Sequence, residues 1–220
     1  MKTIFKLFIV IMPWKIKRFL LVKLYKYQIH SSARIGLSYI FPKHLIMEEG
    51  AIIGHLNVAI HLELIHMGKD CTISQKNWIT GFPLANKSNF QKFPNRKPYL
   101  IMGDDSAITK QHLVDCTDTV TIGKLTSIGG YGTQILSHST SLEQNEQSCA
   151  PITIGHHCFV GTRCVILPGS YLPNHSVLGA GAVMKKRFSN EFMLYGGVPA
   201  KLIKEMDMNY AFFHRTYRPK

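Results

Sequence analysis

A six-residue spacing of aliphatic residues dominates the second half of the chain. Two rules hold over five consecutive units from residue 154: the first position is aliphatic and the fifth is small. The aliphatic set is Ile154, Val160, Ile166, Leu172 and Leu178, and the small set is Cys158, Cys164, Ser170, Ser176 and Ala182. Because five units obey both rules, chance is a poor explanation and an internal repeat is the natural one.

The same spacing continues upstream in a less regular form. Units begin at Ile29, Ile35, Met67, Ile73, Met102, Ile122 and Ile128. A period of six fits neither an amphipathic helix, whose period is 3.6, nor simple strand alternation. It fits short strands joined at corners, where three units make a triangular coil of about 18 residues and stacked coils share one hydrophobic column. The pattern predicts a mainly β solenoid over residues 29–198.

The five cysteines of the chain are odd in number, and their places in the repeat argue against a disulfide framework. Cys71, Cys158 and Cys164 stand where a corner leaves room for a small residue. We therefore expect them to be interior packing thiols without reactivity. Reduced thiols in turn predict a cytoplasmic location.

Two polar segments interrupt the repeat, at residues 82–98 and 139–151. Segments that leave a solenoid carry function more often than its coils do. His138 immediately precedes the second segment and lies between the two best-formed blocks of repeats. Imidazole titrates near neutral pH, so it can take a proton from an attacking hydroxyl or amine and release it afterwards. His138 is therefore the candidate catalytic base.

The amino-terminal end is strongly basic. Residues 1–47 carry nine Lys or Arg and no Asp or Glu, whereas the whole chain has 26 basic and 13 acidic residues. Aliphatic and aromatic residues alternate with these cations. This pattern favours peripheral contact of residues 1–27 with an anionic membrane, on its inner face, and not with nucleic acid. The alternative is an amphipathic helical segment, residues 1–28, that packs on the protein's own body.

Neither a cleaved leader nor a membrane span is predicted at this end. Lys6 interrupts the apolar stretch, and no small-residue cleavage site follows it, so we interpret the segment as retained. An ordinary transmembrane helix needs a run of about 18 apolar residues, which the sequence lacks. At the other end, residues 199–220 are expected to form a helical tail, with Pro199 in its first turn. Its aromatic residues, Tyr210, Phe212, Phe213 and Tyr217, would pack beside the basic end.

Five short blocks carry a family resemblance. They are QILSHS from Gln134, PITIG from Pro151, CFVGT from Cys158, LGAG from Leu178 and GVPAK from Gly197. In this order they resemble the successive blocks of the hexapeptide-repeat acyltransferases, and most closely the branch of bacterial polysaccharide O-acetyltransferases. The resemblance extends from Ile29 to Lys204. It implies a left-handed parallel β-helix that forms a homotrimer, with acetyl coenzyme A as co-substrate and an active site between two subunits.

The resemblance also implies roles for individual residues. His138 matches the histidine that deprotonates the acceptor. Thr162 and Ala180 match residues that contact the pantetheine arm through backbone groups, and Lys201 and Lys204 match positions near the nucleotide phosphates. Lys185 lies in a stretch, AVMKKR, that departs from the family pattern, so its expected contact with phosphate rests on its charge.

Three further residues are candidates for supporting positions. A catalytic imidazole usually has an orienting partner on its other nitrogen, and Glu143 and Glu146 are the nearest acidic residues in the following loop. His112 follows a similar pattern in the polysaccharide branch. It either lines the acceptor site or is a corner histidine that faces water.

The predicted function is transfer of an acetyl group from acetyl coenzyme A to a saccharide hydroxyl in the biosynthesis of a surface polysaccharide. One alternative is an N-acetyltransferase of a nucleotide-linked amino sugar, since an amine also needs deprotonation. Another class is a metal-binding or non-enzymatic β-helix protein. His61 and His66 are a tempting pair for zinc, but no third ligand stands out, so no metal is expected.

Overall fold

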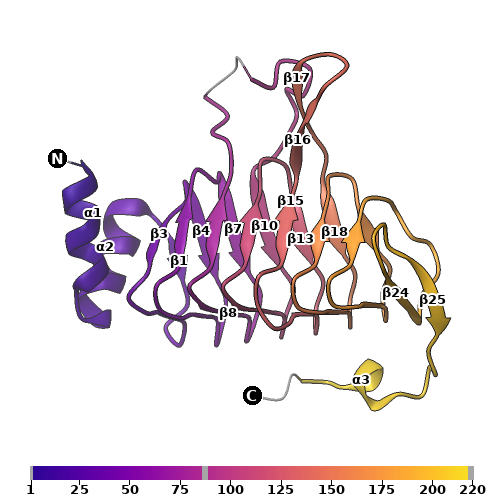
Figure 1. Cartoon of the computed structure of the whole chain (residues 1–220). Helices are drawn as coiled ribbons and strands as arrows, with labels where there is room; N and C mark the ends of the chain where they lie inside the picture. Colours follow the sequence, from indigo (N-terminus) through magenta and orange to yellow (C-terminus); the bar gives the residue numbers. More distant parts are fainter. Residues whose placement is uncertain (1, 86–88, 218–220) are drawn as a thin grey trace.

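A computed structural model of the chain describes residues 2–85 and 89–217, most of which wind into a parallel β-helix (Figure 1). Successive strands run along three faces in turn, and each face is a sheet with one strand from each coil, parallel throughout except for one antiparallel strand at the carboxyl-terminal edge. Ile154 pairs with Leu172 one coil later, which gives the 18-residue coil that the repeat predicts.

The three faces are named here in the order in which the chain visits them. Face A consists of β1 (Gln28–Ile29), β4 (His44–Met47), β7 (Leu64–Met67), β10 (Tyr99–Met102), β13 (Val120–Ile122), β18 (Ile152–Ile154) and β21 (Tyr171–Leu172). Face B consists of β2 (Arg34–Ile35), β5 (Ile52–Ile53), β8 (Thr72–Gln75), β11 (Ala107–Lys110), β14 (Ser127–Ile128), β19 (Phe159–Val160), β22 (Val177–Leu178), β24 (Met193–Gly196) and β25 (Lys201–Glu205). Face C consists of β3 (Tyr39–Phe41), β6 (Val58–Ile60), β9 (Trp78–Thr80), β12 (Leu113–Asp115), β15 (Gln134–Leu136), β20 (Val165–Ile166) and β23 (Val183–Met184).

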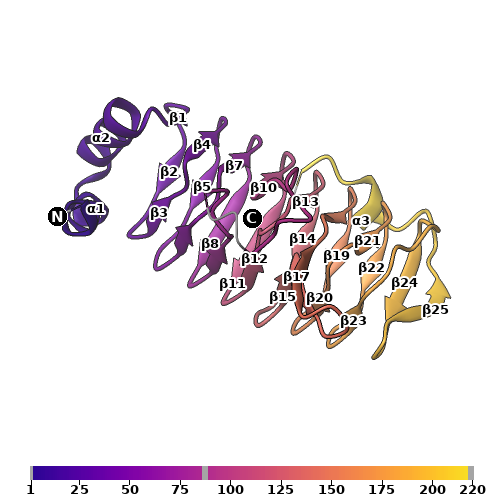
Figure 2. The same ribbon diagram turned by 90° about the horizontal axis from the view of Figure 1, so that it is seen from above.

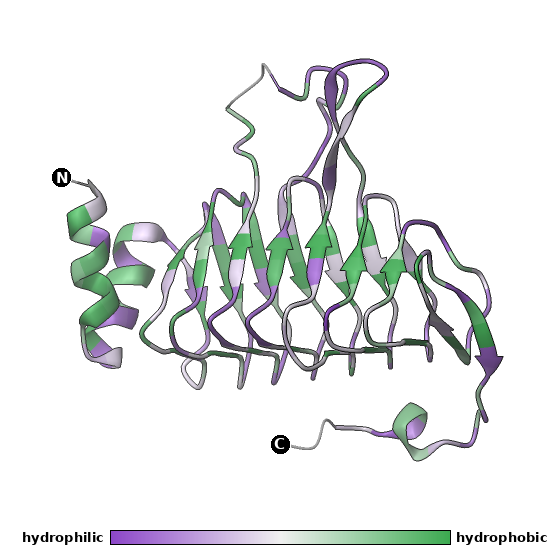
Figure 3. Cartoon of the chain, in the orientation of Figure 1, coloured by the Kyte–Doolittle hydropathy of each residue, from purple (hydrophilic) through white to green (hydrophobic). Residues whose placement is uncertain are grey.

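The interior of the prism is the column that the repeat predicts. The aliphatic and the small residues of all five regular units are fully buried, which confirms both position rules. Figure 3 shows the strands of the coils as largely hydrophobic. At about 1.5–3 kcal/mol for each fully buried aliphatic side chain, this column is the main source of stability. All five cysteines are buried free thiols, and burial raises the pKa of Cys158 to about 12, as expected of an inert filler.

The three corners of the prism differ in their backbone geometry. Between faces A and B, five successive coils each place one residue at a positive φ of 52° to 57°, at Asp70, Asp105, Leu125, His157 and His175. Between faces B and C, four coils use the same left-handed conformation, at Leu56, Lys76, Gln111 and Arg163. The corner between faces C and A has no such constant turn. The C–A corner is therefore the place where the chain can leave the β-helix without breaking the strand pattern.

Both polar interruptions leave at the C–A corner and project from the same edge of the prism (Figure 1). Residues 82–98 run between β9 and β10, with residues 86–88 outside the described part. The second interruption, which we expected as a polar loop, has regular structure. It forms a β-hairpin, β16 (His138–Ser141) with β17 (Glu146–Cys149), in which His138 pairs with Cys149.

The amino-terminal segment forms two helices, α1 (Lys2–Ile11) and α2 (Trp14–Tyr25), where we expected one. Pro13 separates them because proline lacks the backbone donor that a continuous helix needs and clashes with the preceding turn. The two helices lie at the open end of the prism, beside β1 and β3 (Figure 2). In the part of the chain that the structure describes, no helix has the length and apolar character to cross a membrane.

The helix of the carboxyl-terminal tail is shorter than expected and does not begin at residue 199. Residues Lys201–Glu205 form β25, which pairs antiparallel with β24 and covers the edge that the last strand of face B would otherwise expose. Only a short helix follows, α3 (Ala211–His214). Its aromatic residues pack on nearby coils and not on the amino-terminal end, since Phe212 lies against Phe159 and Phe213 against His175. Packing on nearby coils requires a shorter connecting loop than packing at the amino-terminal end, and closing a shorter loop costs less conformational entropy.

Candidate active site

The candidate active site lies on the C–A corner, where three successive coils bring different segments together. The first contributes residues 82–98, the second contributes the turn after β12, and the third contributes the start of the β16–β17 hairpin. Strands β12 and β15 are neighbours on face C, with Asp115 in register with Leu136. This register brings Asp115 beside His138, although 22 residues separate them in the sequence.

His138 and Asp115 form a hydrogen-bonded pair. His138 Nδ1 lies 2.7 Å from Asp115 Oδ2. An ionised carboxylate only accepts hydrogen bonds, so Nδ1 carries the proton and donates it to this contact. The other ring nitrogen, Nε2, then holds a lone pair. The His138 side chain is 39% exposed, against 5% for Asp115. The pair therefore presents a basic nitrogen at the surface and hides the carboxylate that orients it.

The Asp115 carboxylate is fixed by donors on all sides. Oδ2 accepts from the backbone N–H of Ser137 and of His138 and from the Ser137 hydroxyl, at 3.0–3.1 Å. Oδ1 accepts from the Thr117 hydroxyl at 2.7 Å. Burial alone raises the pKa of Asp115, but hydrogen bonds from His138, Thr117 and Ser137 outweigh it and hold the pKa below its usual value. Asp115 is thus a buried anion at neutral pH.

The pKa of His138 moves in the opposite direction. The hydrogen bond to Asp115 raises it, and this effect exceeds the lowering that partial burial causes. A raised pKa makes Nε2 a stronger base, and it means that the imidazolium formed after proton transfer is stabilised by the neighbouring carboxylate.

The wall of the site comes from the interruption at residues 82–98. The ring of Phe90 meets the His138 ring edge-to-face, with centroids 6.1 Å apart, and Phe90 is buried. Arg96 holds this segment in place: its guanidinium donates to the carbonyls of Phe82, Pro83 and Thr117 and lies over the Phe90 ring. Arg96 is itself buried, so it fastens one interruption to the turn that carries Asp115.

The acidic residues that we expected to orient His138 lie elsewhere. Glu143 is exposed in the connection of the hairpin. Glu146 forms an ion pair with Lys92 at 2.6 Å, which joins the hairpin to the first interruption. Between these two segments lies a polar cleft lined by Asn89, Gln91, Lys92, Asn145, Glu146 and Gln147. On the hairpin side of this cleft, Gln147 and Glu146 pair with Thr140 and Ser141 of β16, two and three residues beyond His138, a span of about 7–10 Å along the strand.

His112 neither faces water nor borders His138. It lies at the B–C corner, at the other end of β12 from Asp115, and is 2% exposed. Its Nδ1 accepts the backbone N–H of Thr133 at 3.1 Å, and its Nε2 lies 2.9 Å from the Thr109 hydroxyl. Burial lowers its pKa to about 4, so His112 is a neutral structural residue.

The residues expected to bind the coenzyme lie toward the carboxyl-terminal end. Thr162 and Ala180 follow β19 and β22 at the B–C corner of adjacent coils, joined by the hydrogen bond from Gly181 N–H to the Thr162 carbonyl. Lys185 follows β23 on the same corner as His138, two coils further along, which is about 10 Å. Lys201 and Lys204 are exposed on β25. Face C is thus bordered by His138 on one edge and by Thr162 and Ala180 on the other.

The histidines considered as metal ligands do not form a site. His66 Nε2 pairs with Glu48 at 2.9 Å, and His61 is exposed at a corner. Across residues 2–85 and 89–217, no three His, Cys, Asp or Glu side chains gather closely enough to hold a metal ion.

Asp115, Phe90 and Arg96 are the residues that reading the sequence missed. The register of the repeat did contain a signal for Asp115. Asp115 is the last residue of β12, and β12 stacks directly on β15, the strand that precedes His138. Phe90 and Arg96 lie in a segment without repeat register, and only its folded path brings them to the corner.

Comparison with known proteins identifies similar chains. The galactoside O-acetyltransferase of Escherichia coli (strain K12) is 28% identical over 112 residues, which cover 50% of this chain and 54% of that protein. The chain thus matches about half the length of this curated relative. No family model matches the chain.

Two solved structures show the fold. A hexapeptide-repeat-containing acetyltransferase from Vibrio cholerae superposes with a TM-score of 0.53 and 24% identity, covering 64% of this chain and 74% of that one. An N-acyltransferase from Bacillus cereus, in complex with dTDP-4-amino-4,6-dideoxyglucose and coenzyme A, gives a TM-score of 0.57 at 13% identity, over 88% of each chain. The architecture is the left-handed β-helix of hexapeptide repeats.

Proposed function

We propose that this chain, a member of the hexapeptide-repeat acyltransferase family, transfers an acetyl group from acetyl coenzyme A to a hydroxyl group of a saccharide. The observation that carries the proposal is the 2.7 Å contact between His138 Nδ1 and Asp115 Oδ2, which leaves Nε2 as an exposed base. A histidine base that is held by a carboxylate suits a reaction in which a single proton is transferred, and such a reaction requires no metal ion.

The proposed reaction is a direct transfer. As the acceptor oxygen attacks the thioester carbonyl, His138 Nε2 takes the hydroxyl proton and a C–O bond forms. Asp115 stabilises the resulting imidazolium and keeps the ring in the correct tautomer. Collapse of the tetrahedral intermediate breaks the C–S bond, and the leaving thiolate takes the proton from Nε2. His138 returns to its neutral form, so no covalent enzyme intermediate is required.

Acetyl coenzyme A is the proposed co-substrate, because the structure of one similar protein contains acetyl coenzyme A and that of another contains coenzyme A. Thr162 and Ala180 would contact the pantetheine arm, and Lys185, Lys201 and Lys204 would meet the phosphates. The exposure of all three lysines supports this assignment. Substituting Lys201 and Lys204 by Gln is expected to raise KM for acetyl coenzyme A several-fold, most clearly at low salt, because exposed charges are screened by ions.

A saccharide is the proposed acceptor because the cleft beside the site is polar. Amide and charged side chains line it, and these suit a ligand rich in hydroxyl groups. We assign the chain to the biosynthesis of a surface polysaccharide, in the cytoplasm, on the basis of its resemblance to that branch and its five free thiols. The alternative acceptor is a nucleotide-linked amino sugar, as in the Bacillus cereus complex.

A homotrimer is also proposed, in which a neighbouring subunit would complete the groove at face C. Light scattering should then report a mass about three times the 24.9 kDa of one chain. A monomer with full activity would contradict this assembly.

An acceptor panel tests the function. The purified chain is incubated with acetyl coenzyme A and either neutral saccharides or nucleotide-linked amino sugars, and released thiol is measured, with His138→Ala as the blank. Thiol release with hydroxyl acceptors supports the proposal, whereas release with amino sugars alone favours the alternative. If no member of the panel raises release above the blank while the coenzyme binds, acetyl transfer to a sugar is wrong.

A further inference from the structure

The outer surface of α1 carries a continuous apolar stripe. Ile4, Leu7, Phe8 and Ile11 follow the spacing of one helix face and are 73%, 53%, 53% and 67% exposed. Figure 3 shows this helix, at the extreme end of the molecule, as largely hydrophobic. Four large apolar side chains so exposed on ten residues of helix mark an interaction surface.

The inner surface of the helical pair is fastened to the β-helix. Ile9 and Leu21 are buried in the core. Lys17 Nζ donates to the carbonyls of Val10 and Gly36, at 3.2 and 2.6 Å, and Arg18 donates to the carbonyl of Ile29 at 2.7 Å. Packing of the amino-terminal segment on the protein's own body and its contact with a membrane are therefore both compatible with the structure. One side of the helical pair packs on the body, and this packing leaves the apolar stripe of α1 uncovered.

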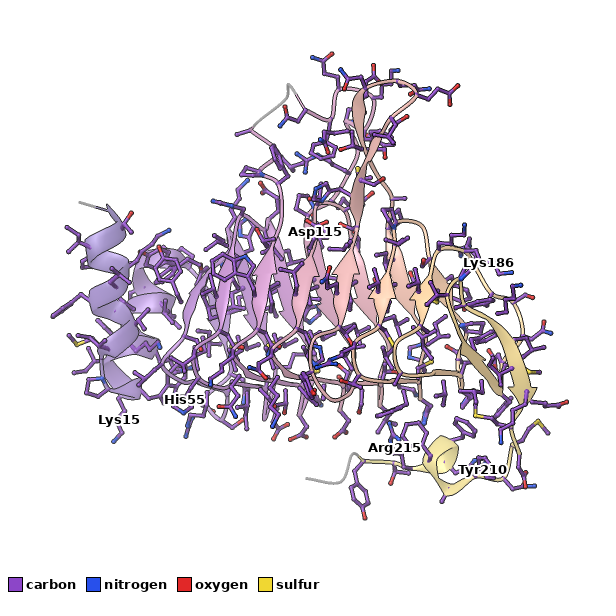
Figure 4. The ribbon with its side chains drawn as sticks, viewed as in Figure 1. Lys15, His55, Asp115, Lys186, Tyr210 and Arg215 are labelled. Atoms are coloured by element: carbon purple, nitrogen blue, oxygen red, sulfur yellow. The ribbon has the colours of Figure 1, made fainter. Side chains whose placement is uncertain are left out.

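Exposed cations accompany the stripe. Lys15, Lys23 and Lys26 project from α2 and its end, and Figure 4 shows Lys15 extending away from the β-helix. The aromatic ring of Phe19 is exposed between them. The chain has no acidic residue before Glu48, so nothing in the helical pair neutralises these charges internally.

We propose that the helical pair, residues 2–26, docks on an anionic phospholipid bilayer. The apolar stripe would lie at the boundary of headgroups and acyl chains, and the lysines would meet lipid phosphates. A bilayer fits better than an acidic protein, because the cations are spread from one end of α2 to the other beside exposed apolar side chains. A plane of anionic headgroups satisfies them without shape complementarity and accepts the apolar side chains.

Docking is separate from catalysis in the fold. Four coil steps, about 20 Å, lie between the first coil and His138. Changes on the outer surface of α1 are therefore expected to leave transfer to a soluble acceptor unchanged. The proposal does not rest on the acetyl transfer, because vesicle binding is measured without coenzyme or acceptor.

Vesicle sedimentation of the full chain tests the proposal. We expect binding to vesicles of mixed phosphatidylglycerol and phosphatidylcholine, weakened by salt, and little binding to phosphatidylcholine alone. Ile4→Gln with Ile11→Gln should weaken partitioning about 30-fold or more. The matched control replaces exposed apolar residues elsewhere, Leu56→Gln with Leu142→Gln, and should bind like the unmodified chain.

A second pair of variants tests the charge. Replacing Lys15, Lys23 and Lys26 by Gln should also weaken partitioning, about 100-fold. The control replaces three exposed lysines of the β-helix, Lys69, Lys110 and Lys124, by Gln and should have little effect. Circular dichroism verifies that each variant is folded.

Three outcomes overturn the proposal. The folded chain remains in solution with anionic vesicles, or the test and control variants bind equally well. In the third, Ile4→Gln with Ile11→Gln lowers the mass of the chain in solution without vesicles, which would mean that a second copy covers the stripe.

Discussion

Two corners of the β-helix, at opposite edges of face C, each hold a histidine, and the fold prepares them for opposite tasks. At the B–C corner, His112 is 2% exposed, and both of its nitrogens lie within hydrogen-bond distance of partners. At the C–A corner, the His138 side chain is 39% exposed, with Nδ1 on Asp115. Burial lowers the pKa of His112 to about 4, whereas the carboxylate raises that of His138.

The comparison shows that residue type alone does not identify a catalytic base. Both histidines lie at coil corners, and both lie close to polar residues. What separates them is a free, exposed nitrogen and a buried anion on the other one. At the B–C corner, His112 accepts a backbone hydrogen bond and stabilises the turn. At the C–A corner, where the chain leaves the β-helix, the His138 side chain is exposed and can meet substrate.

The largest expected effect comes from removing the exposed base. His138→Ala should lower kcat at least about 10²-fold, the usual contribution of a general base. His112→Ala, as the matched variant, should retain kcat within about threefold where it is folded. Steady-state assays with a fixed acceptor compare them, and equal losses in both variants would remove the distinction between the corners.

Asp115→Asn should lower kcat about 10²-fold by disturbing the orientation of His138. The amide can donate to Nδ1 and so favour the tautomer in which Nε2 carries the proton and cannot accept another.

The dependence of activity on pH tests the contact between Asp115 and His138. Because Asp115 raises the pKa of His138, the unmodified chain should lose activity as pH falls through a value above the ordinary 6.5 of histidine. In Asp115→Asn this acid limb of kcat/KM should move to lower pH. An unmoved limb would mean that Asp115 acts only through stability.

The buried histidine should control stability. His112→Ala leaves the Thr133 N–H without its acceptor and opens a cavity, so the free energy of unfolding should fall by about 2–4 kcal/mol at pH 7. The folded pKa of about 4 lies below the unfolded value near 6.5, so the unfolded chain binds the proton first as pH falls. The unmodified chain therefore loses this stability between pH 6.5 and 4. Denaturant titrations should show the difference between the two chains shrinking over that range.

The smallest effect is expected from the acidic residues of the hairpin. Glu143→Gln should leave kcat within about twofold, because Glu143 is exposed away from His138. Glu146→Gln breaks only a surface ion pair with Lys92, which contributes at most about 1 kcal/mol. If either variant lowered kcat as much as Asp115→Asn does, a glutamate of the hairpin would be the residue that orients His138.

Much of the fold could be predicted because the repeat is local. Six residues decide whether a side chain points inward, so the burial of Ile154 or Cys158 could be predicted from its place in one unit. The departure of the chain after His138 was visible for the same reason, as a break in a regular spacing. The helix of the tail was predicted too long because β25 forms to cover a sheet edge, which no local pattern records.

The amino-acid sequence by itself determined the prism, its interior residues and the position where a histidine leaves it, since each follows from neighbours within one or two units. Only the tertiary structure decided which carboxylate meets that histidine and which histidine is sealed inside. Asp115 reaches His138 through pairing between coils, and Arg96 brings Phe90 to the same corner by binding carbonyls of two segments. Such contacts depend on how strands stack in space, because stacking brings together residues that the chain itself keeps a full turn apart.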